Sequence, residues 1–285
     1  MSNTPTDLES KILDAIRKQN LTVEELTSLA KGLKHKTSAG NNVTDHTNRH
    51  DKHFKFALIG DTHFGNKSVD KKALNDFYHK AYKMGVRSFY HCGDLVDGLH
   101  VHRGQEYELY ALGMEQQTAD IIEDYPTKKD AITYYIQGNH DLWYKQNVGG
   151  SIETMISKER EDLVCLGDSE ADVILGSGSK LRLLHPGDGS AYALSYKPQK
   201  IIEAIEGGNK PNIIGIGHYH KSLQMFYRNV FAFLVGTFEH QTPFMRSKGL
   251  SAHMGGWVIE GNSGSKGGIH DISATFIPYM NFKGE

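Results

Sequence analysis

Cysteine is scarce in this chain. Only Cys92 and Cys165 occur among 285 residues, far apart and outside any CxxC pattern. Two isolated cysteines supply neither a disulfide framework nor a cysteine zinc site. We therefore expect both side chains to be reduced thiols of the hydrophobic core.

Long hydrophobic runs and an excess of one charge are also missing. No apolar stretch approaches the ~20 residues that cross a bilayer, and residues 1–20 lack the basic-then-apolar order of a secretory signal. We expect a cytoplasmic protein with no membrane partner. The net charge of −2 argues against a generally basic surface that coats nucleic acid, but it is compatible with a local cationic groove.

Histidine, by contrast, is abundant. The chain has 16 histidines within a composition of 38% hydrophobic and 23% charged residues, which is typical of a soluble globular protein with a core. Imidazole is a favoured ligand of transition metals, so the placement of the histidines along the chain decides what they indicate.

The amino-terminal segment differs from the rest. Residues 1–35 contain two amphipathic helical patterns, each opened by a Thr-x-x-Glu capping box. This helical appendage is either a fragment of a helix-turn-helix module or an arm for docking or oligomerisation. Residues 36–52 have no apolar period and are expected to form a linker, so the main domain is predicted at residues 53–285.

In that domain short apolar runs alternate with helical patterns. Strands are expected at residues 54–59, 86–90, 132–136, 181–184 and 213–216. Helices are expected at residues 71–84, 106–122, 151–161 and 198–205. Beyond Tyr219 the pattern changes to strands at residues 223–226, 230–235, 257–260 and 272–277. The predicted fold class is α/β, with two mixed β-sheets in a sandwich flanked by helices.

Metal-ligand side chains follow five of the expected strands. They are Asp61 and His63, then Asp94, then Asn139, His140 and Asp141, then His185, and finally His218 and His220. In open α/β sheets the loops at the carboxyl ends of the strands converge on one crevice. In extended chain, D-x-H and H-x-H place both donors on the same side. Oxygen and nitrogen donors without thiolate suit Mn²⁺, Fe²⁺, Zn²⁺ or Co²⁺.

The blocks D-x-H, G-D, G-N-H-D, an isolated H and G-H-x-H occur in this order and are all intact. Over roughly residues 54–242 the chain therefore resembles the calcineurin-like metallophosphoesterase family. In motif style it is most similar to the family's DNA-repair nucleases and archaeal polymerase small-subunit exonucleases. The resemblance implies the four-layer fold of that family for residues 53–285. It also implies two divalent ions, with Mn²⁺ expected and Fe²⁺, Zn²⁺, Ni²⁺ or Co²⁺ as alternatives.

The resemblance also implies a role for each residue. One ion would be held by Asp61, His63, Asp94 and His220. The other would be held by Asp94, Asn139, His185 and His218, so that Asp94 bridges the two. His140 would act as proton donor or phosphate partner, oriented by Asp141. Family members often have Gly before the isolated histidine, whereas Leu184 precedes His185 here; Pro186 still keeps His185 extended at a strand end.

Other residues near these blocks have weaker interpretations. His102 and Arg103 closely follow the Asp94 block, and one of them could contact a substrate phosphate, but solvated or hydrogen-bonded side chains without a chemical role are the commoner case. Trp143 and Tyr144 could stack on a base, but packing against a helix is the commoner use of such side chains.

We expect a two-metal-dependent phosphodiesterase that cleaves DNA as an exo- or endonuclease, either as a homo-oligomer or with a replication or repair partner. The expectation of DNA rests on resemblance in residues 61–65 and 138–141, and on the likeness of residues 236–244 to archaeal polymerase small subunits. One alternative is an enzyme for a nucleotide, a cyclic nucleotide or another small phosphoester. Another is a non-catalytic scaffold subunit, but such relatives lose ligands and this chain has lost none.

Overall fold

The computed structural model describes residues 43–45, 52–176, 178–189, 191–264 and 267–279. All of them belong to one compact unit. The helical appendage expected at residues 1–35 lies outside the described residues, as does most of the linker expected at residues 36–52. Within that linker, β1 (Val43–Asp45) forms a short parallel pair with a strand of the main domain.

The first of two sheets is built around the strand that follows the linker. Its order is β12 (Ile269–Pro278), β11 (Gly255–Ser263), β2 (His53–Ile59), β3 (Ser88–His91), β4 (Ile132–Gln137) and β5 (Leu163–Asp168). Strands β2 to β5 run parallel, whereas β11 is antiparallel to both β2 and β12. The carboxyl ends of β2, β3 and β4 therefore lie at the same edge.

The second sheet is also mixed. Its order is β1, β6 (Glu170–Leu175), β7 (Ser179–Leu184), β8 (Ile213–Ile216), β10 (Val230–Val235) and β9 (Ser222–Tyr227). Strands β7, β8 and β10 are parallel. The hairpin β9–β10 turns at Arg228 and Asn229, whose left-handed φ values of 47° and 65° are typical of a tight two-residue turn.

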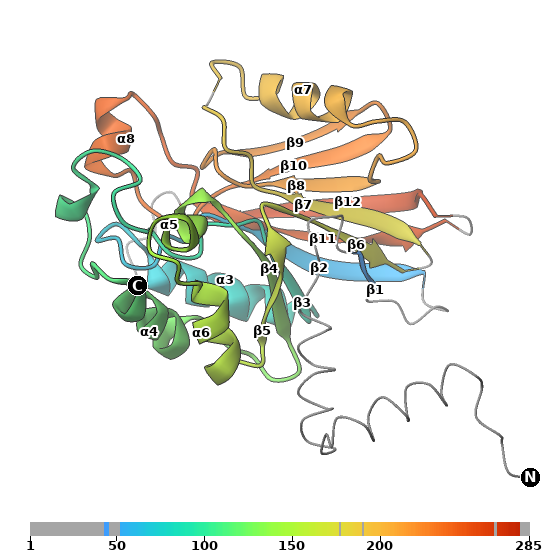
Figure 1. Cartoon of the computed structure of the whole chain (residues 1–285). Helices are drawn as coiled ribbons and strands as arrows, with labels where there is room; N and C mark the ends of the chain where they lie inside the picture. Colours follow the sequence, from blue (N-terminus) through green and yellow to red (C-terminus); the bar gives the residue numbers. More distant parts are fainter. Residues whose placement is uncertain (1–42, 46–51, 177, 190, 265–266, 280–285) are drawn as a thin grey trace, which may run out of the picture. The chain divides into compact units, whose positions relative to one another are not determined.

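Helices cover the outer faces of both sheets, while other helices lie near the strand ends (Figure 1). The outer helices are α3 (Lys71–Lys83), α4 (Met114–Asp124) and α6 (Ile152–Glu159) on the first sheet and α7 (Tyr196–Ala204) on the second. The others are α5 (Asn139–Asn147), α8 (Pro243–Ser247) and the 3₁₀ turn η1 (Gln105–Tyr107). Among the described residues, no helix combines the length and the apolar character needed to cross a bilayer.

Three hydrophobic clusters separate these layers. Leu58, Tyr90 and Ile136 of the first sheet pack between the sheets against Leu183 and Phe233 of the second. A second cluster lies between the first sheet and its helices, and a third lies between the second sheet and α7. The arrangement is helix, sheet, sheet, helix, which confirms the predicted sandwich of two mixed sheets flanked by helices.

One predicted helix is wrong in extent. Residues 106–122 were expected to form a single helix, but they contain part of η1, a loop and most of α4. The regular helix starts only after Gly113, which is extended. Gly104, with a left-handed φ of 86°, precedes η1. Strands β5 and β6 and helices α5 and α8 were not predicted.

Candidate metal centre

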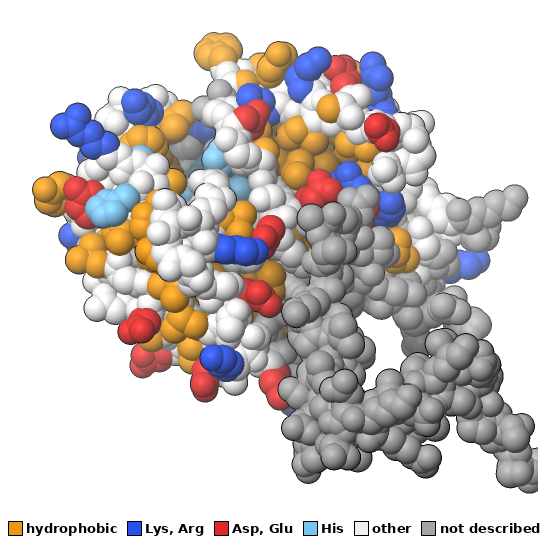
Figure 2. Space-filling view, viewed as in Figure 1, with side chains coloured by type: hydrophobic (Ala, Val, Ile, Leu, Met, Phe, Trp, Pro, Cys, Tyr) orange, Lys and Arg blue, Asp and Glu red, His pale blue; other side chains and the backbone are white. Residues whose placement is uncertain are grey.

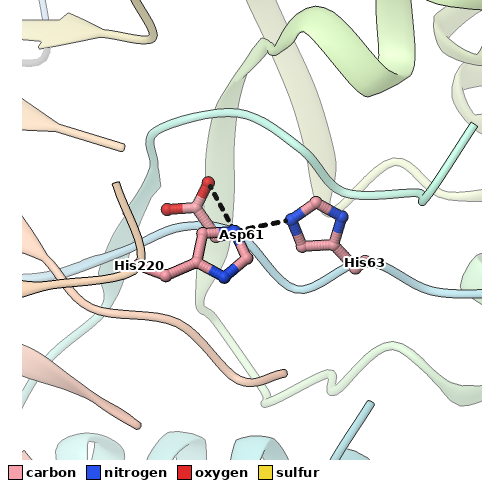
Figure 3. A group of neighbouring side chains, drawn as sticks. All are labelled: Asp61, His63 and His220. Carbon is pink, nitrogen blue, oxygen red and sulfur yellow. Dashed lines mark hydrogen bonds and ion pairs between the residues drawn. The ribbon is translucent and has the colours of Figure 1, made fainter. Parts of the chain in front are cut away.

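The five polar blocks meet at one edge of the sandwich, as expected from their positions after β2, β3, β4, β7 and β8. Asp61, His63 and His220 form one group of neighbouring side chains (Figure 3). Nε2 of His63 lies 3.0 Å from Nε2 of His220, and Nε2 of His220 lies 3.9 Å from Oδ1 of Asp61. Two sheets thus contribute to a single cluster of imidazoles and a carboxylate.

Asp94, His185 and His218 form a second group beside the first. Nε2 of His185 lies 3.0 Å from Oδ2 of Asp94 and 3.0 Å from Oδ1 of Asn139. The same Oδ2 of Asp94 lies 3.9 Å from Nε2 of His63, which belongs to the first group. Asp94 therefore stands between the two groups, where a bridging ligand would have to be.

In three histidines of these groups, one ring nitrogen points away from the other ligands and lies within hydrogen-bond distance of a protein oxygen. Nδ1 of His63 lies 2.8 Å from Oδ1 of Asp97, and Nδ1 of His185 lies 2.7 Å from the carbonyl oxygen of Cys92. Nε2 of His218 lies 2.7 Å from the carbonyl oxygen of Asp188. An N–H that donates outward fixes the tautomer and leaves the opposite nitrogen unprotonated, as metal-ligating histidines require. This donor set fits a pair of divalent transition-metal ions.

The backbone at the ligand positions is unusual. Five candidate ligands have left-handed φ values between 48° and 77°, a region that residues other than glycine seldom adopt. They are Asp61, His63, Asp94, His218 and His220. Such strain persists only where the surrounding structure imposes it, and it is concentrated at functional sites. Here hydrogen bonds impose part of it, because both carboxylate oxygens of Asp61 accept the backbone N–H of His218.

Two glycines allow the loops to approach each other. A Cβ atom at Gly138 would overlap the carboxylate and the backbone nitrogen of Asp94. Gly93 has a φ of 92°, and a Cβ there would overlap the imidazole ring of His185. Close packing of the ligands therefore requires the glycines that precede Asp94 and Asn139, in addition to the turn that each glycine makes out of its strand.

Burial and mutual charge shift the pKa values within the centre. Burial, with a smaller contribution from Asp94, raises the pKa of Asp61 to about 8. Burial also disfavours the charge on Asp94, but His185 and His140 outweigh it and hold the pKa of Asp94 well below its usual range. Burial and the neighbouring His185 lower the pKa of His218 to about 4. Asp94 is therefore the carboxylate that stays ionised, whereas the charges on Asp61 and His218 depend on what the centre binds.

The structure corrects the expected role of Asp141. The ring of His140 is oriented by Asp97, since Nδ1 lies 2.6 Å from the carbonyl oxygen of Asp97 and 3.5 Å from its Oδ1. The carboxylate of Asp141 instead accepts the backbone N–H groups of Gly138, Leu95 and Val96. Asp141 thus ties the loop after β4 to the loop after β3.

A cavity of about 530 Å³ opens onto the centre and is lined by His63, Asp94, His140, His218 and His220 among others. In the space-filling view, histidine atoms reach the surface on the side of the molecule where α5 and α8 lie (Figure 2). His102 lines the same cavity and stacks on Phe244, with ring centroids 4.0 Å apart. The side chain of Arg103 is exposed, and Arg103 is not among the residues that line this cavity.

The aromatic residues after His140 and Asp141 serve packing, as favoured from the sequence. Tyr144 belongs to the core between the first sheet and its helices, and Trp143 packs against that core. Cys92 is buried between the sheets and Cys165 is partly buried, and both are free.

Sequence reasoning missed two residues of the centre, Asp97 and Glu239. Asp97 follows Asp94 by three residues in Gly-Asp-Leu-Val-Asp-Gly, and this second acid in one block is a signal that could have identified it. Glu239 lines the cavity and lies 3.7 Å from His220. It belongs to residues 236–244, whose likeness to archaeal polymerase small subunits drew attention to the segment but gave Glu239 no role.

Comparisons with known proteins agree with this geometry. The family model described as calcineurin-like phosphoesterase matches residues 54–222. The DNA polymerase II small subunit of Methanocaldococcus jannaschii is 26% identical over 245 aligned residues, which cover 71% of this chain and 41% of that protein. The DNA polymerase II small subunit of Archaeoglobus fulgidus is 25% identical over 254 aligned residues, which cover 72% and 51%. The chain thus spans about half the length of the curated relatives it matches.

The solved structures to which the chain is similar are more distant in sequence. Vacuolar protein sorting 29 from Cryptosporidium parvum is 13% identical, with a TM-score of 0.42 over 80% of this chain and 98% of that one. A novel archaeal phosphodiesterase is 14% identical, with a TM-score of 0.39 over 79% of this chain and 100% of that one.

Proposed function

This chain belongs to the calcineurin-like phosphoesterase family, and from this premise we propose that it is a two-metal-dependent phosphodiesterase. The observation that carries the proposal is the pair of adjacent donor groups, Asp61 with His63 and His220, and Asp94 with His185 and His218. Within each group the ligand atoms lie within 4.8 Å of one another. Chains that keep such a fold only as a scaffold have no need of two complete groups.

We propose two ligand sets, which the positions of the two groups support. One ion would be held by Asp61, His63, Asp94 and His220. The other would be held by Asp94, Asn139, His185 and His218. When bound, such a pair of ions neutralises charge on a phosphate and acidifies water at neutral pH. Asn139 contributes an amide oxygen without adding negative charge beside an anionic substrate. We propose Mn²⁺ as the ion, with Fe²⁺, Zn²⁺ or Co²⁺ as alternatives that the same oxygen and imidazole donors also suit.

His140 is the proposed proton donor to the leaving oxygen. Burial alone would lower its pKa, but the carboxylates of Asp94 and Asp97 outweigh burial and raise the pKa of His140 to about 10. These two carboxylates therefore favour the protonated ring, which is the form that a proton donor requires. Because Nδ1 is engaged by Asp97, Nε2 is the nitrogen that gives its proton to the departing alkoxide. General acid catalysis of this kind contributes roughly 10²- to 10⁴-fold in rate.

The proposed substrate is DNA. Support comes from the curated relatives, which are named as DNA polymerase II small subunits. The cavity has side chains suited to a nucleotide chain, because Phe244 and His102 form a stacked aromatic pair near its rim and Lys248 adds a cation. A partner protein of replication or repair is proposed on the same ground, and the exposed Arg103 is proposed to contact the phosphate backbone outside the cavity.

The experiment compares substrates on one preparation. Labelled single-stranded and double-stranded DNA and a small chromogenic phosphodiester are incubated with the Mn²⁺-loaded protein and with Asp94→Asn. We expect the wild-type protein to degrade DNA and the variant to be inactive on every substrate. Turnover of the small diester alone would favour the alternative, an enzyme for nucleotides or other small phosphoesters. No metal-dependent turnover of any substrate would refute the hydrolase.

A further inference from the structure

Glu239 is a buried acid with unsatisfied hydrogen-bonding groups around it. It lies in the segment after β10, only 2% of it is exposed, and it lines the cavity of the candidate metal centre. Within the described residues, Oε1 of Glu239 and Nδ1 of His220 have no hydrogen-bond partner. Oε2 of Glu239 lies 3.7 Å from that same Nδ1. Buried polar groups without partners are costly, so this pair calls for an explanation.

His220 is the exception among the histidines of the two groups. His63, His185 and His218 each have one ring nitrogen engaged by a protein oxygen. For His220 the oxygen that faces the outward nitrogen belongs to Glu239. A charge-assisted N–H···O bond is about 2.7 to 2.9 Å long. The carboxylate of Glu239 therefore has to move by only about an ångström to accept a hydrogen bond from Nδ1 of His220.

The backbone of Glu239 is anchored to another candidate ligand. The Thr237 hydroxyl donates to the carbonyl oxygen of Asp61 at 2.7 Å and accepts the backbone N–H of Glu239 at 3.0 Å. The backbone N–H of Phe238 also donates to the carbonyl oxygen of Asp61. The segment that carries Glu239 is thus fixed relative to Asp61, which belongs to the same group as His220.

We propose that Glu239 is a positioning residue of the metal centre, whose carboxylate accepts a hydrogen bond from Nδ1–H of His220 and so keeps Nε2 unprotonated and directed at the ion. This inference rests on the proposed two-metal centre. It assigns to Glu239 the same task that Asp97 performs for His63. An outer carboxylate of this kind raises ligand basicity, and its loss typically costs 10- to 100-fold in metal affinity.

Glu108 offers a matched control. It lines the same cavity, and its Oε2 is also buried without a hydrogen-bond partner among the described residues. Its Oε1 accepts the backbone N–H of Phe244, so it serves a loop rather than a histidine. Glu108→Gln removes a carboxylate from the same cavity but leaves Glu239, the proposed partner of His220, in place.

The test is a calorimetric titration of Mn²⁺ into chelator-treated wild-type protein, Glu239→Gln and Glu108→Gln. We expect Glu239→Gln to bind one of its two ions about 10- to 100-fold more weakly, and Glu108→Gln to bind both nearly as the wild type does. Unchanged affinity in Glu239→Gln overturns the inference, as does an equal loss in both variants, which would indicate a general effect of cavity charge. A wild-type protein that binds no metal would instead refute the proposed function.

A second measurement needs no variant and therefore does not depend on the folding of Glu239→Gln. In the Zn²⁺-loaded wild-type protein, ¹⁵N–¹H correlation spectra report which ring nitrogen of each histidine is protonated. We expect His220 to carry its proton on Nδ1 in a hydrogen bond, with Nε2 unprotonated. A proton on Nε2 or an Nδ1 proton that exchanges freely with water would overturn the assignment.

Discussion

The backbone N–H of His140 donates a 2.9 Å hydrogen bond to Oδ1 of Asp94. The proposed proton donor and the proposed bridging ligand are therefore linked directly, although they follow different strands. Oδ2 of Asp94 faces the imidazole of His185 at 3.0 Å. One oxygen of Asp94 thus fixes the start of α5, while the other faces the donor groups.

Asp94→Asn tests the bridge. The variant keeps the size of the side chain but removes the charge that would lie between two cations, so we expect loss of most bound metal and of activity. The chain should still fold, because the amide can accept the N–H of His140. Metal per chain by mass spectrometry and circular dichroism check both parts. Asp124→Asn, on the surface near Lys71, serves as control and should keep its metal. Near-normal turnover of Asp94→Asn would contradict the assignment.

His140→Asn separates metal binding from proton transfer. We expect both ions to remain bound, because no ligand is removed, and the rate to fall about 10²- to 10⁴-fold. The loss should be greatest for esters with a poor leaving group, since these depend most on protonation of the departing oxygen. Rates for aryl and alkyl phosphodiesters, measured on fully loaded protein, provide the comparison. A variant as fast as the wild type on alkyl esters would mean that the proton comes from elsewhere.

Gly138→Ala tests the close approach of two loops. The added methyl group would overlap the carboxylate and the backbone nitrogen of Asp94, so Asp94 has to move. We expect a loss of about 1 to 3 kcal/mol in the free energy of unfolding, together with weaker metal binding. Urea titration and calorimetry measure the two effects. Gly207→Ala is the control, because a Cβ there meets open space. Equal effects of both substitutions would show that the approach is not tight.

The sequence predicted those parts of the fold that depend on local patterns. Apolar runs located β2, β4 and β8, and the order of the polar blocks brought ligands from five loops together. Failures occurred where neighbours in space decide the structure. Residues 106–122 have helical periodicity, but the Gln117 side chain donates to the carbonyl oxygen of Ala111, in the loop before α4, and to that of Gly98. The side chain of Gln105 likewise bonds to the backbone of Asp97 and Val101.

The missed residues of the centre have the same explanation. Asp97 lies 34 residues from His63 in the sequence and still farther from His140, and Glu239 lies 19 residues from His220. Only the folded chain brings these acids close to their histidines. Asp141 was given the wrong partner for a related reason. Its neighbour in sequence is His140, but the first turn of α5 directs the carboxylate of Asp141 to backbone N–H groups of the loop after β3.

Arg160 and Asp162 provide a test of stability away from the metal centre. Nε of Arg160 lies 2.7 Å from Oδ1 of Asp162, and Nη2 lies 2.8 Å from Oδ2. Nη1 donates to backbone carbonyls at the end of α4, including that of Ile121. Arg160→Met removes these bonds, and we expect it to cost about 1 to 3 kcal/mol of unfolding free energy near pH 7.

The cost should depend on pH in a definite direction. Burial would raise the pKa of Asp162, but hydrogen bonds, above all from Arg160, outweigh burial and lower it. A carboxyl group with a lowered pKa in the folded state contributes stability above its unfolded pKa of about 3.9 and loses it as the pH falls through the folded value. The difference between wild type and Arg160→Met should therefore shrink as the pH falls from about 7 to about 3. Urea titrations across that range measure the difference in unfolding free energy.

The control uses a chain in which residue 162 can no longer ionise. The difference in unfolding free energy between Asp162→Asn and the double variant Asp162→Asn/Arg160→Met should not change with pH. A difference between wild type and Arg160→Met that stays constant or grows on acidification would mean that the ion pair does not stabilise the fold.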